Sequence, residues 1–323
     1  MITITSSFGF KYERYFVNLY MTNGQPAYIR TYESGGLIKR IERCRKKYSD
    51  CTICPHKCHV NRYIRSEGFC KSGFLPVVSS AGRHLGEEPP LVGKNGSGTI
   101  FFTHCNLKCI YCQNYDISHE GSGTEIIYKQ LADIMVSLQD EGCHNINFVT
   151  PTHMVLSILE ALPMAIEKGL NIPLVYNSGG YDSVETLQLL DGIIDIYMPD
   201  FKYMETASAE DFSKVKLYPQ LVKNAISLMH QQVGDLKLND EGIAYRGLMV
   251  RHLILSGFID ESKQVIDYIS DLSKDTYLNL MDQYHPEFRA CEERRLSRRV
   301  SRKEYFEVIN YAKNTGLRRL EYN

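Results

Sequence analysis

Apolar runs rich in β-branched and aromatic residues recur along the chain from about residue 99 onward, and amphipathic stretches lie between them. The runs predict six strands, at residues 99–103, 146–149, 173–176, 194–198, 248–255 and 277–281. Strands that alternate with helices are typical of a parallel sheet. The six units therefore predict an α/β fold, a partial (β/α)6 TIM-like barrel that is shorter than the complete eight-unit form.

The clearest helical pattern has apolar residues at positions 127, 131, 134 and 138, a spacing that places them on one face toward a sheet. Helix starts are indicated where a side-chain oxygen can accept hydrogen bonds from the free amides of a first turn. Three pairs of residues have this spacing: Asp182 with Glu185, Ser208 with Asp211, and Ser301 with Glu304.

The first hundred residues differ from the rest, because they hold few strand signals. A helix-like run at residues 37–47 is followed by the cysteine-rich segment "CTICPHKCHVNRYIRSEGFCKSG" and then by the loop-like "GEEPPLVGKNGSG". We therefore predict two parts. Residues 1–95 form an N-terminal extension with a cysteine-rich metal-binding segment, and residues 96–323 form the barrel.

Composition and charge narrow the class of protein. The 323 residues are 43% hydrophobic and 23% charged, as in ordinary globular proteins. A formal net charge of −1 gives no overall attraction to nucleic acid or to an anionic membrane. The chain begins without a secretion signal and has no apolar run of about 18 residues, so we expect a cytoplasmic protein without a membrane partner. The basic run "RRLSRRVSRK" is expected to be a solvated face balanced by nearby acids; a dock for an acidic partner or RNA is the alternative.

Three cysteines crowd into the stretch "CNLKCIYCQN", directly after the first predicted barrel strand. Cys105, Cys109 and Cys112 therefore lie at the carboxyl-end face, where parallel α/β folds build their active sites. Closed zinc and iron–sulfur sites take four protein ligands, but the next cysteine, Cys143, lies 31 residues beyond Cys112. The residues alone leave open a distant fourth ligand, a structural zinc or thiol cluster, and a site with one position free for a small molecule.

The pattern C-x3-C-x2-C after the first strand of a partial α/β barrel resembles the radical S-adenosylmethionine (SAM) superfamily. In that family the three cysteines hold a [4Fe-4S] cluster, and the amino and carboxylate groups of SAM occupy the fourth coordination position. An electron from the cluster then cleaves SAM to give a 5′-deoxyadenosyl radical. The resemblance implies the ligand role for Cys105, Cys109 and Cys112.

Longer stretches resemble the pyruvate formate-lyase activating enzyme-like subgroup from about residue 50 onward. They include "CTICPHKC", "GEEPPL", "NFVTPTH", "YNSGGY", "MPDFKY", "GLMVRHLILSG" and "LMDQYHP". The resemblance implies that Ser178 and Gly179 lie in the loop on the ribose side of SAM, and that Asp200 and Lys202 lie near its methionyl carboxylate and the substrate. Thr150 stands where many radical SAM proteins have a "GGEP"-like stretch, and it is the candidate SAM-binding residue there.

Charged residues in predicted strands need partners. Asp200 and Lys202 are two positions apart and point to the same face, so both enter the barrel mouth or neither does. Arg251 lies within "LMVRHLIL", where an unpaired charge would be costly to bury, and it predicts a carboxylate or phosphate partner as well as a site at the barrel mouth. The neighbouring His252 is expected to be a core histidine with satisfied hydrogen bonds. No residue is assigned a catalytic role.

A second set of four cysteines has the spacing C-x2-C-x3-C-x11-C: Cys51, Cys54, Cys58 and Cys70. Four thiols can close a site, and they fit either zinc or a second [4Fe-4S] cluster. His56 and His59 could each replace one cysteine, and free thiols or a redox relay are the alternatives. The remaining cysteines are expected to be ordinary thiols: Cys44, Cys143 and Cys291.

The leading hypothesis is a radical SAM enzyme that abstracts hydrogen from an unidentified substrate. The resemblance to activating enzymes implies an oxidoreductase, with a glycyl-radical protein as a candidate substrate and an electron donor such as flavodoxin or ferredoxin as partner. Modification of a peptide, an RNA or a small molecule is the alternative, although nucleic acid is not favoured by the charge. The alternative of another class is a non-catalytic protein that uses both cysteine sets structurally.

Overall fold

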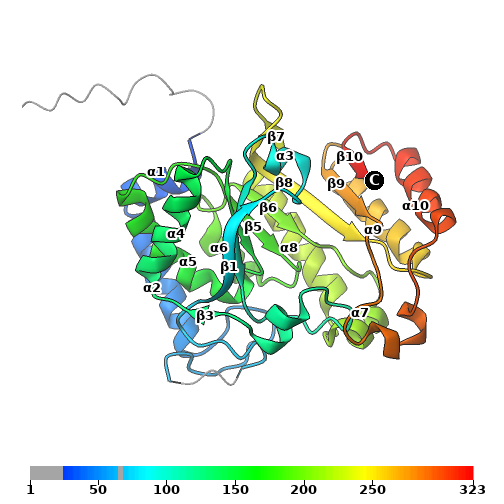
Figure 1. Cartoon of the computed structure of the whole chain (residues 1–323), viewed down its shortest axis with the longest axis horizontal. Helices are drawn as coiled ribbons and strands as arrows, with labels where there is room; N and C mark the ends of the chain where they lie inside the picture. Colours follow the sequence, from blue (N-terminus) through cyan, green and yellow to red (C-terminus); the bar gives the residue numbers. More distant parts are fainter. Residues whose placement is uncertain (1–24, 65–67, 323) are drawn as a thin grey trace, which may run out of the picture.

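A mixed sheet forms the centre of the molecule (Figure 1), and the computed structural model describes residues 25–64 and 68–322 of the chain. Residues 1–24 and 65–67, which belong to the predicted N-terminal extension, lie outside this range. The strand order is β10-β9-β8-β6-β5-β4-β2-β1-β3, and β7 pairs with β8.

The six predicted strands are all present and adjacent. They are β2 (Ser97–Phe102), β4 (Ile146–Val149), β5 (Leu174–Ser178), β6 (Ile196–Pro199), β8 (Ala244–Leu253) and β9 (Tyr277–Met281). Each of them pairs in parallel with the next. The strand order does not return from β9 to β2, so the barrel is partial. The fold class predicted from the sequence is confirmed.

Four further strands escaped the sequence pattern: β1 (Val77–His84), β3 (Thr124–Glu125), β7 (Lys237–Leu238) and β10 (Leu320–Tyr322). Three of them have only two or three residues, and most side chains of β1 are not buried, so no apolar run marks it. β1 runs antiparallel to β2 and precedes residue 95. The sheet therefore begins before the predicted boundary, and the division into two domains stays a prediction.

Helices cover the sheet because they follow its strands and bury apolar faces against it. In chain order they are α4 (Tyr128–Asp140), α5 (Val155–Glu167), α6 (Val184–Leu190), α7 (Thr206–Ser213), α8 (Tyr218–Val233), α9 (Ile259–Leu272) and α10 (Arg302–Asn314). The helix expected near residues 37–47 is α2 (Gly36–Ser49), which follows α1 (Ala27–Glu33) and contacts α5 (Figure 1). A short α3 (Pro89–Val92) leads into β2.

Two of the three expected helix starts are wrong. Ser301 and Glu304 form the expected capping box of α10. At α6 the N-cap is Ser183, one residue later than expected, because Asp182 accepts hydrogen bonds from other side chains. Ser208 lies inside α7, and its hydroxyl donates to a carboxylate of α9 and not to a first-turn partner.

Two features concern the surface of the described residues, the lack of a long apolar helix and the pairing of the basic run. Within the described ranges, no helix combines the length and apolarity that crossing a membrane requires. In the basic run, Arg295 pairs with Asp211 and Glu293, and Arg298 pairs with Glu304. Two of the six basic residues of this run are thus ion-paired on the surface, and a role of the run in binding a partner stays a prediction.

Candidate active site

A cavity of about 280 Å³ opens at the carboxyl ends of the parallel strands. Each residue predicted from the sequence for a site in the barrel lines this cavity: Cys105, Cys109, Cys112, Thr150, Ser178, Gly179, Asp200, Lys202 and Arg251. The three cysteines come from the loop after β2, and the others come from the ends of β4, β5, β6 and β8. The structure thus brings together residues that lie up to about 150 positions apart in the sequence.

Each of the three thiols has a hydrogen-bond donor beside its sulfur atom. The backbone N–H of Leu107 donates to the sulfur of Cys105 at 3.3 Å. The hydroxyl of Ser213 lies 2.9 Å from the sulfur of Cys109, and the hydroxyl of Ser118 lies 3.1 Å from that of Cys112. These donors suit sulfur atoms that act as acceptors, as metal-bound thiolates do.

Burial raises the pKa of two of these thiols. Loss of solvent raises the pKa of Cys105 to about 12, and it also raises the pKa of Cys109. Bare thiols at these positions are protonated at neutral pH, whereas a coordinated metal deprotonates a thiol outright. Three soft donors in one loop, each with a hydrogen-bond partner, fit an iron–sulfur cluster with one position left open.

Cys143 cannot supply a fourth ligand to this loop. Its Cβ lies beside Gly98 in the first half of β2, whereas Cys105 follows the other end of that strand. Among residues 25–64 and 68–322, no three His, Cys, Asp or Glu side chains are arranged tightly enough to hold a single metal ion. The ligand role of the cysteines therefore stays a prediction, supported by their common cavity.

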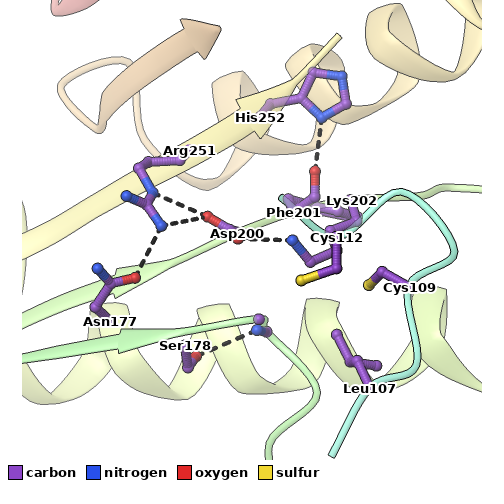
Figure 2. Close-up of polar contacts among 12 residues, drawn as sticks. Leu107, Cys109, Cys112, Asn177, Ser178, Asp200, Phe201, Lys202, Arg251 and His252 are labelled. Atoms are coloured by element: carbon purple, nitrogen blue, oxygen red, sulfur yellow. Dashed lines mark hydrogen bonds and ion pairs between the residues drawn. The ribbon is translucent and has the colours of Figure 1, made fainter. Parts of the chain in front are cut away.

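A network of charged side chains forms one wall of the cavity (Figure 2). The carboxylate of Asp200 lies 2.7 Å from the ammonium nitrogen of Lys202 and 2.9 Å from the guanidinium of Arg251. Arg251 also donates to the side-chain oxygen of Asn177 at 2.8 Å. Asp200 and Lys202 thus enter the barrel mouth together, and Arg251 has the carboxylate partner that its buried position predicted.

Two more carboxylates extend this network into the barrel. Glu88 and Glu87 lie 3.5 Å and 3.8 Å from Arg251, and both side chains are buried. Burial acts to raise the pKa of Asp200, but Arg251 and Lys202 outweigh it, so this pKa lies below its ordinary value. Both cations already have protein carboxylates as partners, so neither one requires a bound anion to balance its charge.

The loop after β5 is held by a buried aspartate. Asp182 accepts hydrogen bonds from Ser178 at 2.6 Å, Thr152 at 2.7 Å and Tyr176 at 2.8 Å. The hydroxyl of Ser178 is therefore engaged inside the protein. Gly180 has a φ of 76°, and a Cβ there would collide with the carbonyl oxygen of Asp200, so only glycine fits this turn.

Thr150 has an unusual backbone conformation. Its φ is 58°, a left-handed value that is strained for a β-branched residue and costs on the order of 1–3 kcal/mol. Its backbone N–H donates to the carbonyl of Asn177 at 2.9 Å, which ties the β4 loop to the end of β5. Such strain is typical of functional loops.

His252 and the N-terminal cysteines also have defined surroundings. His252 is 2% exposed and hydrogen-bonds Phe201 and Ser262, so it is the expected core histidine.

Cys51, Cys54 and Cys70 are buried, and Cys58 is half-buried, in a segment that packs against the cysteine loop of the barrel. His56 hydrogen-bonds a backbone carbonyl, and His59 pairs with Asp50 at the surface.

The sequence did not predict several residues of the cavity lining or the side chains that hydrogen-bond to them. Asn177 lies in the quoted stretch "YNSGGY" at the end of β5, and its strand-end position could have indicated it. Ser213 lies 104 residues from Cys109, and no local signal points to their contact. The hydroxyl of Tyr203 hydrogen-bonds both Ser213, at 2.7 Å, and Tyr111, at 2.6 Å, and Tyr111 is itself a residue of the cavity lining.

Comparison with known proteins identifies the family. The model of the radical SAM superfamily matches residues 99–239, which include the three-cysteine loop and the strand ends through β6. The chain carries a radical SAM superfamily domain. This radical SAM protein is 34% identical over 288 residues to "Uncharacterized protein MJ0674" of Methanocaldococcus jannaschii, and the match covers 86% of this chain and 78% of that protein.

Solved structures are more distant. A radical SAM methyltransferase from Sphaerobacter thermophilus has a TM-score of 0.49 and 13% identity, with 70% of this chain and 66% of that chain covered. SuiB from Streptococcus suis, in a structure with S-adenosylmethionine bound, has a TM-score of 0.47 and 10% identity, with 68% of this chain covered. This radical SAM protein spans about half the length of SuiB, 48%. Such distant likenesses say nothing about the substrate of this chain.

Proposed function

We propose that this radical SAM protein is an enzyme that cleaves SAM in the barrel cavity and abstracts hydrogen from a substrate. The observation that carries the proposal is that three thiols of one loop and the polar ends of the neighbouring parallel strands line the same cavity. Cys105, Cys109 and Cys112 would hold a [4Fe-4S] cluster there. A cluster held there would supply the electron for reductive cleavage of a carbon–sulfur bond of SAM.

The residues of the chain have separate tasks in this proposal. The donors at Leu107, Ser213 and Ser118 stabilise negative charge on the three sulfur atoms. Lys202 offers a cation at the cavity wall to the carboxylate of SAM, and Asp200 fixes its position from 2.7 Å away.

The loops after β4 and β5 would hold the rest of SAM. Ser178 is immobilised by Asp182, and Gly179 presents backbone without a side chain at the cavity, which suits close approach of a ribose. Thr150 would contact the amino end of SAM from its strained loop. These roles combine the family resemblance with the position of each residue at the cavity.

The substrate and partners belong to the proposal as well. The motifs similar to pyruvate formate-lyase activating enzymes support a glycyl-radical protein as substrate, and a flavodoxin or ferredoxin as electron donor in the cytoplasm. A peptide, an RNA or a small molecule is the alternative substrate. The wall of paired charges at Asp200, Lys202 and Arg251 would serve any of these, because it is rigid before the substrate arrives.

SAM cleavage tests the proposal. The full-length protein, reconstituted anaerobically with iron and sulfide and then reduced, is expected to convert SAM to 5′-deoxyadenosine and methionine. Cys109→Ser should lower this rate more than about 100-fold, beyond the loss caused by removing a hydrogen-bond partner of a ligand. Cys143→Ser is the matched control, because Cys143 is also a buried cysteine but lies at the far end of β2. Equal rates in both variants would refute the ligand role of Cys109, and absence of cleavage by the wild-type protein would favour the non-catalytic metal or thiol protein.

A further inference from the structure

The four N-terminal cysteines lie in one short segment that backbone hydrogen bonds fold back on itself. Cys51 and Cys54 are each 5% exposed and Cys70 is 7% exposed. The backbone N–H of Cys51 donates to Val60, and that of His59 donates back to Cys51, so the chain doubles back and brings Cys58 toward Cys51. Further along the segment, the backbone N–H of Phe69 donates to the sulfur of Cys58 at 3.4 Å. All four are free thiols.

Arg62 is buried beside them without a carboxylate. Its side chain is 2% exposed, and it donates to the carbonyl oxygens of His153 and Gly73 at 2.6 Å and of Ser72 at 3.1 Å. Its guanidinium lies 4.0 Å from the centre of the Tyr48 ring. In the described part of the chain, no acidic side chain lies within ion-pair distance of it. Carbonyls satisfy its donors, but no carboxylate among the described residues balances its positive charge, and an unbalanced buried charge costs several kcal/mol.

The cysteines are the groups placed to supply this counter-charge. Cys70, Cys51 and Cys54 lie close enough to Arg62 to act on its charge, as the Tyr48 and Cys44 side chains also do. A buried free thiol is neutral near pH 7, whereas a metal-bound thiol is a thiolate. Four thiolates outweigh the two positive charges of Zn²⁺ or of an oxidised [4Fe-4S] core. The bound form is therefore negative, and it is the form that a buried arginine stabilises.

We propose that Cys51, Cys54, Cys58 and Cys70 form a four-thiolate metal centre, with Arg62 as its buried counter-ion. A tetrahedral zinc ion would hold the four sulfur atoms ~3.8 Å apart, as follows from the Zn–S bond length. The ion is either zinc or the iron of a [4Fe-4S] cluster, since both take four thiolates. The centre requires no SAM, so it exists whether or not the barrel cavity cleaves SAM.

The centre is joined to the two loops that line the barrel cavity. His56, between Cys54 and Cys58, stacks on Phe69 at 3.7 Å and lies 2.8 Å from the carbonyl oxygen of Asn106, the residue after Cys105. Arg62 reaches the carbonyl of His153 in the β4 loop. Loss of metal from the four-thiolate centre would therefore loosen both loops. Its role is to position the candidate active site.

Metal content of a variant without the barrel cysteines tests the centre directly. The full chain carrying Cys105→Ser, Cys109→Ser and Cys112→Ser is supplied anaerobically with zinc alone, or with iron and sulfide. We expect retention of about one zinc or about four irons per chain. Adding Cys54→Ser and Cys58→Ser should remove this metal, whereas adding Cys143→Ser and Cys291→Ser should not. A triple variant with native circular dichroism that holds neither metal in stoichiometric amount overturns the proposal.

The same metal analysis in the wild-type background keeps the test informative if the triple variant misfolds. There, Cys54→Ser with Cys58→Ser should lower the metal content by the amount of one centre. An unchanged metal content overturns the proposal, and this outcome is independent of SAM cleavage. Conversely, absence of SAM cleavage in a protein that keeps this metal contradicts only the proposed function.

Substitutions of Arg62 test its role as counter-ion. Arg62→Met should weaken metal binding at least tenfold in competition with a chelator, and Arg62→Lys, which keeps the charge, should weaken it less. Arg45→Met is the matched control, because Arg45 lies on α2 but is 55% exposed and paired with Glu160. Equal metal affinities in the Arg62→Lys variant, the Arg62→Met variant and the control would refute the counter-ion role. A selective loss in Arg62→Met supports it.

Discussion

Replacing Asp200 by asparagine removes the one anion that contacts both cations at the cavity wall. Asparagine has the same shape as aspartate, so the change leaves packing intact. Its amide oxygen can accept from Lys202 or from Arg251, but its NH2 group then points at the other donor. Lys202 and Arg251 are only 15% and 17% exposed, so water cannot fully replace the lost carboxylate.

The size of the effect follows from these distances. At an effective dielectric constant of about 20, each pair at ~2.8 Å has an attraction of roughly 6 kcal/mol before desolvation is subtracted. Breaking a buried pair by removing one partner costs 3–5 kcal/mol on average. Partial exposure reduces this figure, and Glu87 and Glu88 still compensate Arg251. We expect Asp200→Asn to lower the free energy of unfolding by about 3 kcal/mol.

Urea unfolding of the metal-free protein measures this loss, and a constant m-value shows that the unfolded state is unaffected. Asp133→Asn is the matched control. Asp133 also contacts two cations, Lys129 and Lys168, but it is 40% exposed, so its removal should destabilise the protein much less than Asp200→Asn does.

A loss below about 1 kcal/mol in Asp200→Asn, equal to that in the control, would refute the reasoning from buried charge. The pH dependence gives a second check. Because the pKa of Asp200 is lowered in the folded protein, its contribution is present above about pH 4 and disappears as the pH falls through the lower folded value. The difference between wild type and Asp200→Asn should therefore shrink in acid.

Three further predictions concern the same fold. Thr150→Gly should relieve the strain at a φ of 58° and raise the free energy of unfolding by about 1 kcal/mol, while weakening SAM binding measured by calorimetry; a loss of stability would contradict the strain. Burial lowers the pKa of His252 to about 4, so the free energy of unfolding should fall by up to about 3 kcal/mol as the pH drops from about 6.5 to 4. His252→Gln should weaken this pH dependence in urea titrations. The same pH dependence in the variant and in the wild type would contradict the role of His252. Ser213→Ala should make the potential of the bound cluster more negative in a redox titration, because the sulfur of Cys109 loses its neighbouring hydroxyl. Ser208→Ala, which removes a hydroxyl that donates to a carboxylate of α9, should leave the potential unchanged.

The elements with long apolar runs were predictable because their side chains are buried on both sheet faces. β2, β4 and β5 are buried at nearly every position, and the sequence shows this as continuous apolar stretches. β1 could not be predicted in this way, since it lies near the sheet edge with most side chains partly or fully exposed. β10 has only three residues, too few to form a pattern.

The candidate site was predictable wherever a residue follows a strand. Parallel strands place their carboxyl ends at one edge, so Cys105, Asp200 and the other strand-end residues meet there. Supporting contacts were not predictable, because they join residues far apart in the chain. Ser213 beside Cys109 and Arg62 beside the N-terminal cysteines depend on the packing of whole segments, for which the sequence has no local pattern.

The central claim is that three thiolates hold a cluster with one iron open to SAM. The electron paramagnetic resonance spectrum of the reduced cluster tests it most directly, because a ligand that binds to the open iron changes the spectrum. The Cys54→Ser, Cys58→Ser variant is used, so that the barrel cluster gives the signal. The account predicts that SAM shifts this spectrum, and that Cys109→Ser in the same background removes the signal. A spectrum that saturating SAM leaves unchanged would contradict the account.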